Sequence, residues 1–394
     1  VNIGANDVAN SMATSVASRA LTIKKAVFVA AACNVFGAIL VGAHVANTIR
    51  KGLVNPLHFA EMPNLFVYGM LAAVLGSALW VNIATYFKLP VSTTHSIVGG
   101  VLGFGLVSVG FAGIHWNVVI YIVLSWIISP VFGGLVSYII FSIIRKSILE
   151  SHSPIEKTKR IGPFFVGIVV FMLVMAIICK GLKNLHLDFS FVEAFIISCI
   201  AGAAAYFVGY ILLRRYNEKQ TDPYYQVEQM TIPLQVLTAS IKAFSHGAND
   251  VANAIGPVAA IVVVLRTHEV SMQVPVPIWL LIVGGLGIGL GAYIWGHRVI
   301  ETVGEKITAI TPTRGFAAEF GTAVSVLTCT RLGMPVSTTH VSIGNIIGVG
   351  LARGVSAINL NVIKKIFAAW VISVPVAGLF SAALYGFFIF LFGT

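Results

Sequence analysis

The segment Gly247-Ala248-Asn249-Asp250-Val251-Ala252-Asn253 lies midway through an apolar run at residues 232–265. The same seven residues open the chain as Gly4-Ala5-Asn6-Asp7-Val8-Ala9-Asn10, 243 positions earlier. A carboxylate inside a segment of hydrocarbon length costs roughly 3 kcal/mol on insertion scales. Because the chain carries this cost twice in an identical heptapeptide, both aspartates are predicted to serve its function.

Composition places the chain in a membrane. Its 394 residues are 57% hydrophobic and 10% charged, with a mean hydropathy of +0.92. These values predict an all-α integral membrane protein with roughly 10–12 membrane segments and the lipid bilayer as its surroundings. The net charge of +11 does not indicate a nucleic-acid partner, because the basic residues concentrate in the loops. The chain starts only three residues before the first motif, whereas about 15 apolar residues precede the second copy, so we expect its natural N-terminus to be missing or trimmed.

A second motif is also duplicated. Pro90-Val91-Ser92-Thr93-Thr94-His95 recurs as Pro335-Val336-Ser337-Thr338-Thr339-His340, 245 positions later. The order and spacing of both motifs are kept, which indicates a duplicated unit. We divide the chain into a first repeat at 1–144, connecting transmembrane helices at 145–213, a linker at 214–231 and a second repeat at 232–394.

The two repeats are predicted to point in opposite directions. Six apolar runs lie between the two aspartate motifs, so the motif helices are an odd number of passages apart. With this topology, 18 of the 25 Lys and Arg residues lie in loops on one side of the membrane and six lie in loops on the other side. The remaining one, Lys242, lies inside a helix. The positive-inside rule then makes the linker 214–231 cytoplasmic and puts both termini outside, in the plasma membrane. Opposed repeats with broken helices are typical of secondary transporters.

Each Pro-Val-Ser-Thr-Thr-His motif follows a basic residue, Lys88 or Arg331. The turns lie either at the membrane surface or at the tips of re-entrant hairpins. We favour re-entrant hairpins, because only these let the motif reach the aspartates halfway along their helices. Such backbone is tolerated where protein or an aqueous cavity surrounds it.

The aspartate motif offers hard oxygen ligands. Gly, Asn and Asp weaken helical hydrogen bonding, so we expect a helix break that frees backbone carbonyls. With the carboxylates and amide oxygens, these carbonyls suit Na⁺, while a proton on the carboxylate is the alternative. The predicted Na⁺ ligands are Asp7, Asn6, Asn10, Asp250, Asn249, Asn253 and Glu319. Glu319 lies in an apolar run without an acidic counterpart in the first repeat, and it is either a cation ligand or a member of a structural ion pair.

The hydroxyl motif suits an anion. Pro precedes three hydroxyl residues at a predicted helix N-terminus, where free N–H groups and the helix dipole favour negative charge. The same hydroxyls could instead simply cap the helices. Two such sites from opposed repeats could converge on one tetrahedral oxyanion. The predicted anion-binding residues are Ser92, Thr93, Thr94, Ser337, Thr338, Thr339, Asp7, Asp250, Asn10 and Asn253.

The aspartates favour phosphate over sulfate. Phosphate near neutral pH still carries an O–H group, because its second pKa is about 6. A carboxylate can accept a hydrogen bond from that group, whereas sulfate offers none. Competition by sulfate at equal concentration would contradict this hypothesis.

With these two duplicated motifs the chain closely resembles the PiT family of inorganic phosphate transporters over essentially its whole length. The resemblance implies cation-coupled phosphate uptake through two opposed repeats, with Na⁺ in one branch and protons or metal–phosphate in another. It assigns phosphate and cation contacts to the Asp, Asn, Ser and Thr residues named above. Glu319 falls in a family-like Gly-Phe-x-x-Glu stretch, Asn34 stands where many relatives carry an acid, and linker 214–231 is shorter than in many relatives.

We therefore predict a secondary transporter that imports phosphate with Na⁺ as coupling ion, without an organic cofactor. An H⁺-coupled phosphate or sulfate permease is the alternative, and an anion channel is a further one. An enzyme is not predicted, because no nucleophile or zinc pattern occurs, and neither is a primary pump, because no phosphate-binding G-x-x-x-x-G-K-[ST] loop occurs. A homodimer is a family-level expectation.

Overall fold

The computed structural model describes residues 1–50, 53–178, 189–217, 222–270, 276–331 and 336–393, with side chains described throughout except at 43–50, 327, 330 and 331. Nearly all of these residues are helical, and the only β pairing among them is an isolated bridge between Val54 and Ile114. The α-helices are α1 (Asn2–Ala17), α2 (Ile23–Arg50), α3 (Pro63–Tyr86), α4 (Thr93–Ser108), α5 (Trp116–Ile144), α6 (Pro154–Ala176), α7 (Phe191–Arg214), α8 (Pro223–Thr267), α9 (Ile278–Trp295), α10 (His297–Glu305), α11 (Pro312–Arg331), α12 (Thr338–Leu351) and α13 (Leu360–Phe392).

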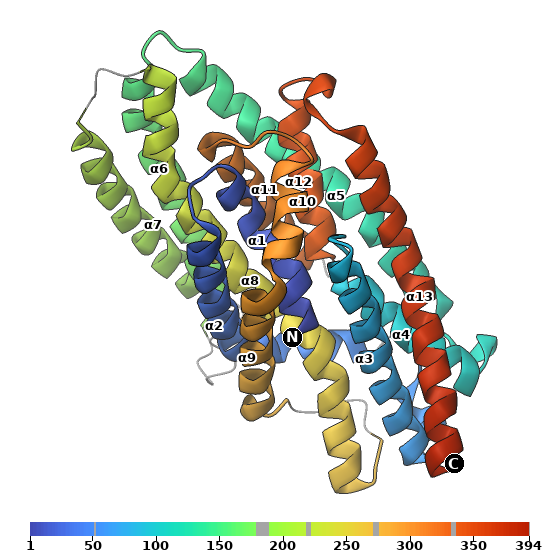
Figure 1. Cartoon of the computed structure of the whole chain (residues 1–394). Helices are drawn as coiled ribbons and strands as arrows, with labels where there is room; N and C mark the ends of the chain where they lie inside the picture. The colour runs from blue at the N-terminus through green and yellow to red at the C-terminus, as the bar shows by residue number, and fades with distance from the viewer. Residues whose placement is uncertain (51–52, 179–188, 218–221, 271–275, 332–335, 394) are drawn as a thin grey trace.

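Within the described residues, eight helices are long and apolar enough to cross a membrane, namely α2, α3, α5, α6, α7, α8, α9 and α13. This agrees with the predicted all-helical membrane class. The aspartate motifs lie on α1 and in the middle of α8, at the centre of the molecule (Figure 1). At 45 residues, α8 is roughly 68 Å long, about twice what a bilayer core needs.

The expected break at the aspartate motifs does not occur, and that prediction was wrong. Both α1 and α8 run through the motif as continuous helix. The motif glycines instead permit close helix crossings, since a Cβ at Gly247 would overlap the Asn34 carbonyl of α2 and one at Gly4 the Ile288 carbonyl of α9. The side chains of the motif hydrogen-bond to the hairpins, so they do not compete with the backbone of their own helix.

The hydroxyl motifs form the tips of two hairpins, α3–α4 and α11–α12. Helices α4 and α12, with 16 and 14 residues, span only about 24 and 21 Å, less than the ~30 Å of a bilayer core. Their N-terminal ends meet inside the protein, where the Ser337 hydroxyl donates to the Ser92 hydroxyl at 2.8 Å. The hairpins therefore have the re-entrant form that we favoured.

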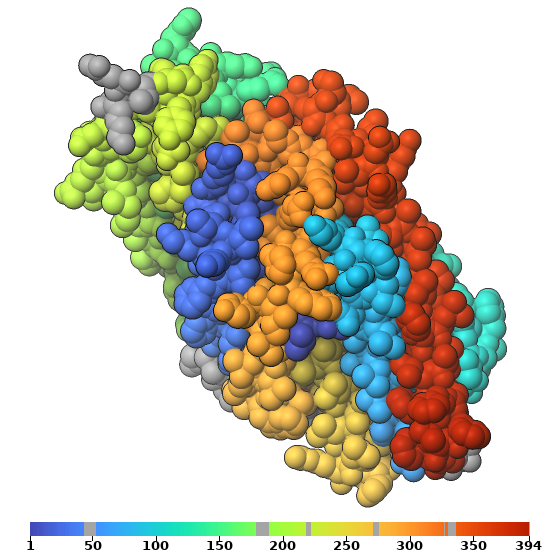
Figure 2. Space-filling view, in the orientation of Figure 1, coloured from blue at the N-terminus to red at the C-terminus, as the bar shows by residue number. Residues whose placement is uncertain are grey.

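Lys88 lies on the outside of the first hairpin tip. Its side chain is 48% exposed and pairs with Glu301 of α10 at 3.0 Å. Figure 2 shows this turn (cyan) on the surface beside α10 (orange). A positive φ of 59° at Lys88 lets the chain reverse direction there. The corresponding side chain of Arg331 is outside the described part of the protein.

The two repeats interlock. Helix α4 of the first repeat packs on α13 of the second, and α12 of the second packs on α5 of the first. Glycines make these approaches possible in matching positions, because a Cβ at Gly99 would overlap the Val374 carbonyl and one at Gly344 the Pro130 carbonyl. Helices α6 and α7 form a separate pair at one side (Figure 1).

The linker is shorter than we predicted. Helix α7 ends at Arg214 and α8 already begins at Pro223, so residues 223–231 belong to α8. Asp222 caps this helix by accepting from the Tyr224 amide, and Pro occupies the first helical position. This Asp-Pro pair is a helix-start signal, which we interpreted as a loop. Positions 218–221 of the predicted linker lie outside the described residues.

Candidate functional site

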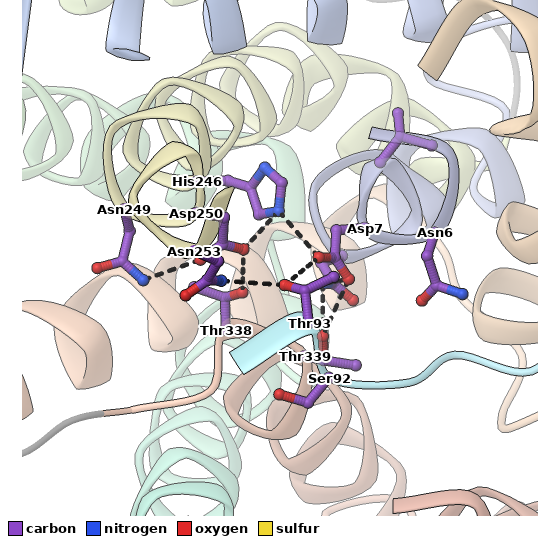
Figure 3. A network of polar contacts seen from close by, with 12 residues as sticks. Asn6, Asp7, Ser92, Thr93, His246, Asn249, Asp250, Asn253, Thr338 and Thr339 are labelled. Atoms are coloured by element: carbon purple, nitrogen blue, oxygen red, sulfur yellow. Dashed lines mark hydrogen bonds and ion pairs between the residues drawn. The ribbon is translucent and has the colours of Figure 1, made fainter. Parts of the chain in front are cut away.

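The carboxylates of Asp7 and Asp250 are fully buried and lie close together (Figure 3). Asp7 accepts hydrogen bonds from Thr93 at 2.9 Å and from Thr339 at 3.3 Å. Asp250 accepts from Thr338 at 2.9 Å. Because Thr93 and Thr338 are equivalent residues of the two repeats, the two aspartate helices and the two hairpin tips form one approximately symmetric centre.

His246 lies between the two carboxylates. Its Nε2 atom is 2.7 Å from an Asp250 oxygen and 3.7 Å from an Asp7 oxygen. Its Nδ1 atom is 2.6 Å from Oδ1 of Asn34, whose amide nitrogen donates to the Ala30 carbonyl. The bond to Ala30 fixes the Asn34 amide so that its oxygen faces the ring. Oxygen atoms thus flank both ring nitrogens, at Asp250 and at Asn34.

The sequence analysis missed His246. We found no spacing signal for it, because the first repeat has Ile3 at the equivalent position. The available signal was its position four residues before Asp250, which puts both side chains on one helical face.

The motif asparagines reach across between repeats. Asn10 donates to Thr339 at 2.8 Å and also to the Asp7 carboxylate at 3.1 Å. Asn253 donates to Thr93 at 3.1 Å and to Thr94 at 3.4 Å. The Oδ1 atom of Asn10 is buried and has no hydrogen-bond partner among the described residues. A buried acceptor without a donor is costly, and a cation beside it would satisfy it.

Asn6 and Asn249 differ from these two. Asn6 donates to Thr85 and to the Leu89 carbonyl and accepts from the Val91 amide, so it fastens α1 to the first hairpin. Figure 3 shows Asn6 apart from His246 and Asp250. Asn249 donates to Asp250 at 2.9 Å and lines the neighbouring cavity. Asn6 was a predicted cation ligand, but its side chain hydrogen-bonds to the first hairpin and not to Asp7 or Asp250.

Ser92 and Ser337 cap the hairpin helices. Their hydroxyls accept from the amides of His95 and His340, at 3.2 and 3.3 Å. The His340 ring stacks on Trp370 and the His95 ring on Trp126, with centroid separations of 3.6 and 3.4 Å. The two serines therefore hold the tips in place, and the threonines that follow them contact the carboxylates.

Glu319 belongs to a second polar cluster. Its buried carboxylate accepts from Thr14 at 2.6 Å, Ser15 at 2.9 Å and Thr238 at 2.6 Å. Gln235 adds a longer contact of 3.4 Å. A carboxylate surrounded by hydroxyl oxygens is suited to holding a hard cation, but the cluster is not shared with Asp7 and Asp250.

Lys242 connects the two clusters. It lies on α8 one turn after Thr238 and is 6% exposed. Its ammonium group donates to Ser342 at 2.9 Å, and Ser342 donates to the Asn10 carbonyl at 3.0 Å. Because Thr238 donates to Glu319, Lys242 lies one helical turn from the Glu319 cluster. The sequence signal was present, because Lys242 interrupts the apolar run at 232–265, but we gave it no role.

A cavity of about 80 Å³ opens beside these groups. Polar residues of both repeats line part of it, among them Asn10, Ser11, Lys242, His246, Asn249 and Thr338. An all-helical membrane protein whose opposed repeats bring two buried carboxylates and hydroxyls of both hairpin tips to one centre, beside a cavity lined by a lysine and a histidine, has the construction of a secondary transporter.

Comparisons with known proteins also indicate a transporter. Residues 3–381 match the Phosphate transporter family. A relative from Pyrococcus abyssi, named "Putative phosphate permease", is 45% identical over 383 residues, which cover 97% of this chain and 93% of the relative. One of the same name from Haemophilus influenzae is 38% identical over 390 residues, covering 97% and 92%. A solved structure titled "The sodium-dependent phosphate transporter" is 42% identical, covers 99% of this chain and 96% of that chain, and has a TM-score of 0.91.

The chain therefore belongs to the phosphate transporter family. It is a phosphate-transporting membrane protein and not an enzyme.

Proposed function

We propose that the protein imports inorganic phosphate together with Na⁺ by alternating access of its two repeats. The observation that carries this proposal is the convergence of Asp7 and Asp250 with threonines of both hairpin tips at one buried centre. A carboxylate pair needs a cation or a protonated partner, and the unpaired Asn10 oxygen adds a further cation ligand. The similar structure carries "sodium-dependent" in its title, which supports Na⁺.

Phosphate would enter with its remaining O–H group toward a carboxylate. The threonine hydroxyls that now donate to Asp7 and Asp250 could rotate to donate to phosphate oxygens, since hydroxyl rotors are free to choose acceptors. The nearby ammonium of Lys242 would balance the charge of the anion. Sulfate offers no proton to the carboxylates, so we expect it to compete poorly with phosphate.

Uptake of radiolabelled phosphate into proteoliposomes tests the proposal. Internal pH is clamped, and uptake is compared with and without an inward Na⁺ gradient. We expect uptake only with Na⁺, little inhibition by equal sulfate, and loss of uptake in Asp250→Asn. Glu301→Gln, which changes an exposed carboxylate outside the centre, should transport like the wild type. Absence of phosphate uptake under every gradient would refute the proposal.

Proton coupling is the second candidate, and the position of His246 favours it. A ring with acceptors at both nitrogens, placed between two carboxylates, could pass a proton to either of them. Uptake driven by a pH gradient alone, with no Na⁺ requirement, would establish this alternative. His246→Gln should then abolish coupling to the pH gradient.

A further inference from the structure

A second basic site lies away from the transport centre. It is a pocket of about 430 Å³ where α5 ends, α8 and α11 begin, and α12 ends. Three arginines from separate segments line it, Arg145, Arg314 and Arg353, together with Tyr224 and Glu228. We call it the arginine pocket. It shares no lining residue with the cavity beside Asp250.

Backbone carbonyls hold the three guanidinium groups in place. Arg145 donates to the Ala352 carbonyl at 2.6 Å. Arg314 and Arg353 both donate to the Ala309 carbonyl, each at 3.2 Å. Two like charges therefore share one neutral acceptor, an arrangement that positions them but does not neutralise them.

Two carboxylates lie near the three arginines. Both oxygens of Glu228 accept from Thr313, one from its amide at 2.7 Å and one from its hydroxyl at 2.8 Å. Glu150 is 57% exposed and lies 3.2 Å from Arg145. Within the described residues, neither Arg314 nor Arg353 forms an ion pair. Three arginines against the carboxylates of Glu228 and Glu150 leave an excess of one positive charge, which suits an external anion.

The arginine pocket also breaks the internal symmetry of the chain. At the repeat offset of 245, the positions equivalent to Arg314 and Arg353 are Gly69 and Ser108. At the offset of 244 that relates α5 to α13, Arg145 corresponds to Ile389. Because the motifs of the transport centre occur in both repeats and these arginines have no basic counterpart at the equivalent positions, the pocket is a feature added to the duplicated unit.

We propose that the arginine pocket binds a phosphate group of one or two negative charges. Guanidinium groups offer paired donors that match phosphate oxygens, and the excess charge of the pocket fits such an anion. Its two sources are dissolved inorganic phosphate and the headgroup of an anionic phospholipid. The second fits the apolar neighbours Phe141 and Leu149 and the exposed Ile143 on the same helix, because basic pockets between membrane helices bind such headgroups.

The bound group would link both arms of the second hairpin to α5. Arg314 is in the first turn of α11, and Arg353 comes two residues after the end of α12. An anion held by both residues and by Arg145 therefore joins the outer ends of that hairpin. The first hairpin has no equivalent clamp.

The test compares wild type with Arg314→Gln/Arg353→Gln. Lys364→Gln/Lys365→Gln is the matched control, since it removes the same charge from exposed residues outside the pocket. One arm measures labelled phosphate bound per chain by equilibrium dialysis of the detergent-purified protein. The other counts phosphatidylglycerol retained per chain by native mass spectrometry, with phosphatidylcholine as the neutral comparison.

We expect wild type and control to bind one more anion per chain than the glutamine pair in one of the two arms. Binding to the glutamine pair should be weaker by about tenfold or more, because two charge-assisted contacts are lost. The arm that responds identifies the source. Equal binding by all three proteins in both arms would overturn the proposal. Neither readout requires transport, so a failure of phosphate uptake would not affect the result.

A folding control completes the design. If the glutamine pair aggregates in size-exclusion chromatography, Arg314→Lys/Arg353→Lys replaces it, since it keeps both charges and loses only the planar fork. We expect this pair to bind at least about threefold more weakly than wild type. Wild-type binding by the lysine pair would contradict the proposed recognition.

Discussion

At the residue scale, the transport centre depends on a balance of buried charges. Asp7, Asp250 and Glu319 are buried carboxylates, and Lys242 and His246 are the basic side chains closest to them. Buried charges are retained only when partners compensate their lost hydration. A change at any of these residues is therefore expected to alter both stability and ion dependence.

Asp7→Asn should weaken cation coupling more than phosphate binding. The substitution keeps the shape and one acceptor oxygen but removes the charge that would attract Na⁺. We expect the Na⁺ concentration for half-maximal uptake to rise about tenfold or more, which corresponds to roughly 1.4 kcal/mol. The phosphate affinity at saturating Na⁺ should change far less. A shift confined to phosphate affinity would contradict the assignment of Asp7 as a cation ligand.

Lys242→Met should destabilise the protein, because it leaves the Glu319 carboxylate buried without its basic neighbour. Loss of one partner from a directly paired buried ion pair costs about 3–5 kcal/mol, which sets an upper bound for Lys242, whose ammonium group donates to Ser342. Adding Glu319→Gln to Lys242→Met should recover most of the lost stability. A double-mutant cycle of unfolding free energies, determined in mild detergent, measures this recovery. Strictly additive losses would show that the two residues do not interact. Lys364→Met, at an exposed site, serves as the control.

At the element scale, the aspartate motif is a crossing point of helices. Gly247 brings α8 against α2, and Gly37 of α2 lies against the Phe244 carbonyl in the same crossing. This contact holds Asn34 beside His246, so the helix crossing and the polar centre depend on one another.

Gly247→Ala should therefore prevent normal packing of α2 on α8. The added methyl group would lie on the backbone of Asn34, which cannot move aside as a flexible side chain could. We expect a lower yield of monodisperse protein and a lower melting temperature. Gly386→Ala in α13 is the matched control, because nothing lies within 4 Å of its added Cβ. Equal melting temperatures for the two variants would refute the close crossing.

The hairpin tips are elements with two tasks. Ser92 and Ser337 cap α4 and α12, whereas Thr93 and Thr338 contact the aspartates. Thr338→Val should thus lower phosphate affinity with little effect on stability. Ser337→Ala should also reduce stability, by about 1 kcal/mol for the lost cap. Phosphate titration of uptake and thermal melting distinguish the two effects, and identical behaviour of both variants would contradict this division.

At the scale of the whole molecule, the repeats share their packing partners. Each hairpin helix rests on the long final helix of the other repeat, so the two repeats cannot fold as independent domains.

We propose that the boundaries 1–144 and 232–394 mark the duplicated sequence units. The distribution of Lys and Arg supports a cytoplasmic position for the segment around 214–217 and external termini.

Labelling of single cysteines in intact cells tests this orientation. With the natural cysteines replaced, Ser153→Cys lies before α6, on the side that we predict to be cytoplasmic, and Ala60→Cys lies before α3, on the side that we predict to be external. Both positions are exposed. A membrane-impermeant maleimide should label Ala60→Cys in intact cells and Ser153→Cys only after the cells are permeabilised. The reverse pattern would invert the proposed topology.

The sequence by itself determined the membrane class, the duplication, the re-entrant hairpins and most polar residues of the centre. Hydropathy and an identical motif are local properties, so they can be read without knowing the fold. The positions of Asp7 and Asp250 were evident because buried carboxylates are costly in a membrane.

Only the tertiary structure decided how these residues are used. His246 became part of the centre through Asn34, 212 positions away, and Asn6 was directed to the first hairpin by Thr85 and Val91. Helix α8 is continuous at the motif, although Gly, Asn and Asp have low helix propensity. Gly247 serves instead to let α8 pack closely against α2. Contacts between segments so distant in the chain depend on how the repeats interlock, which no local pattern encodes.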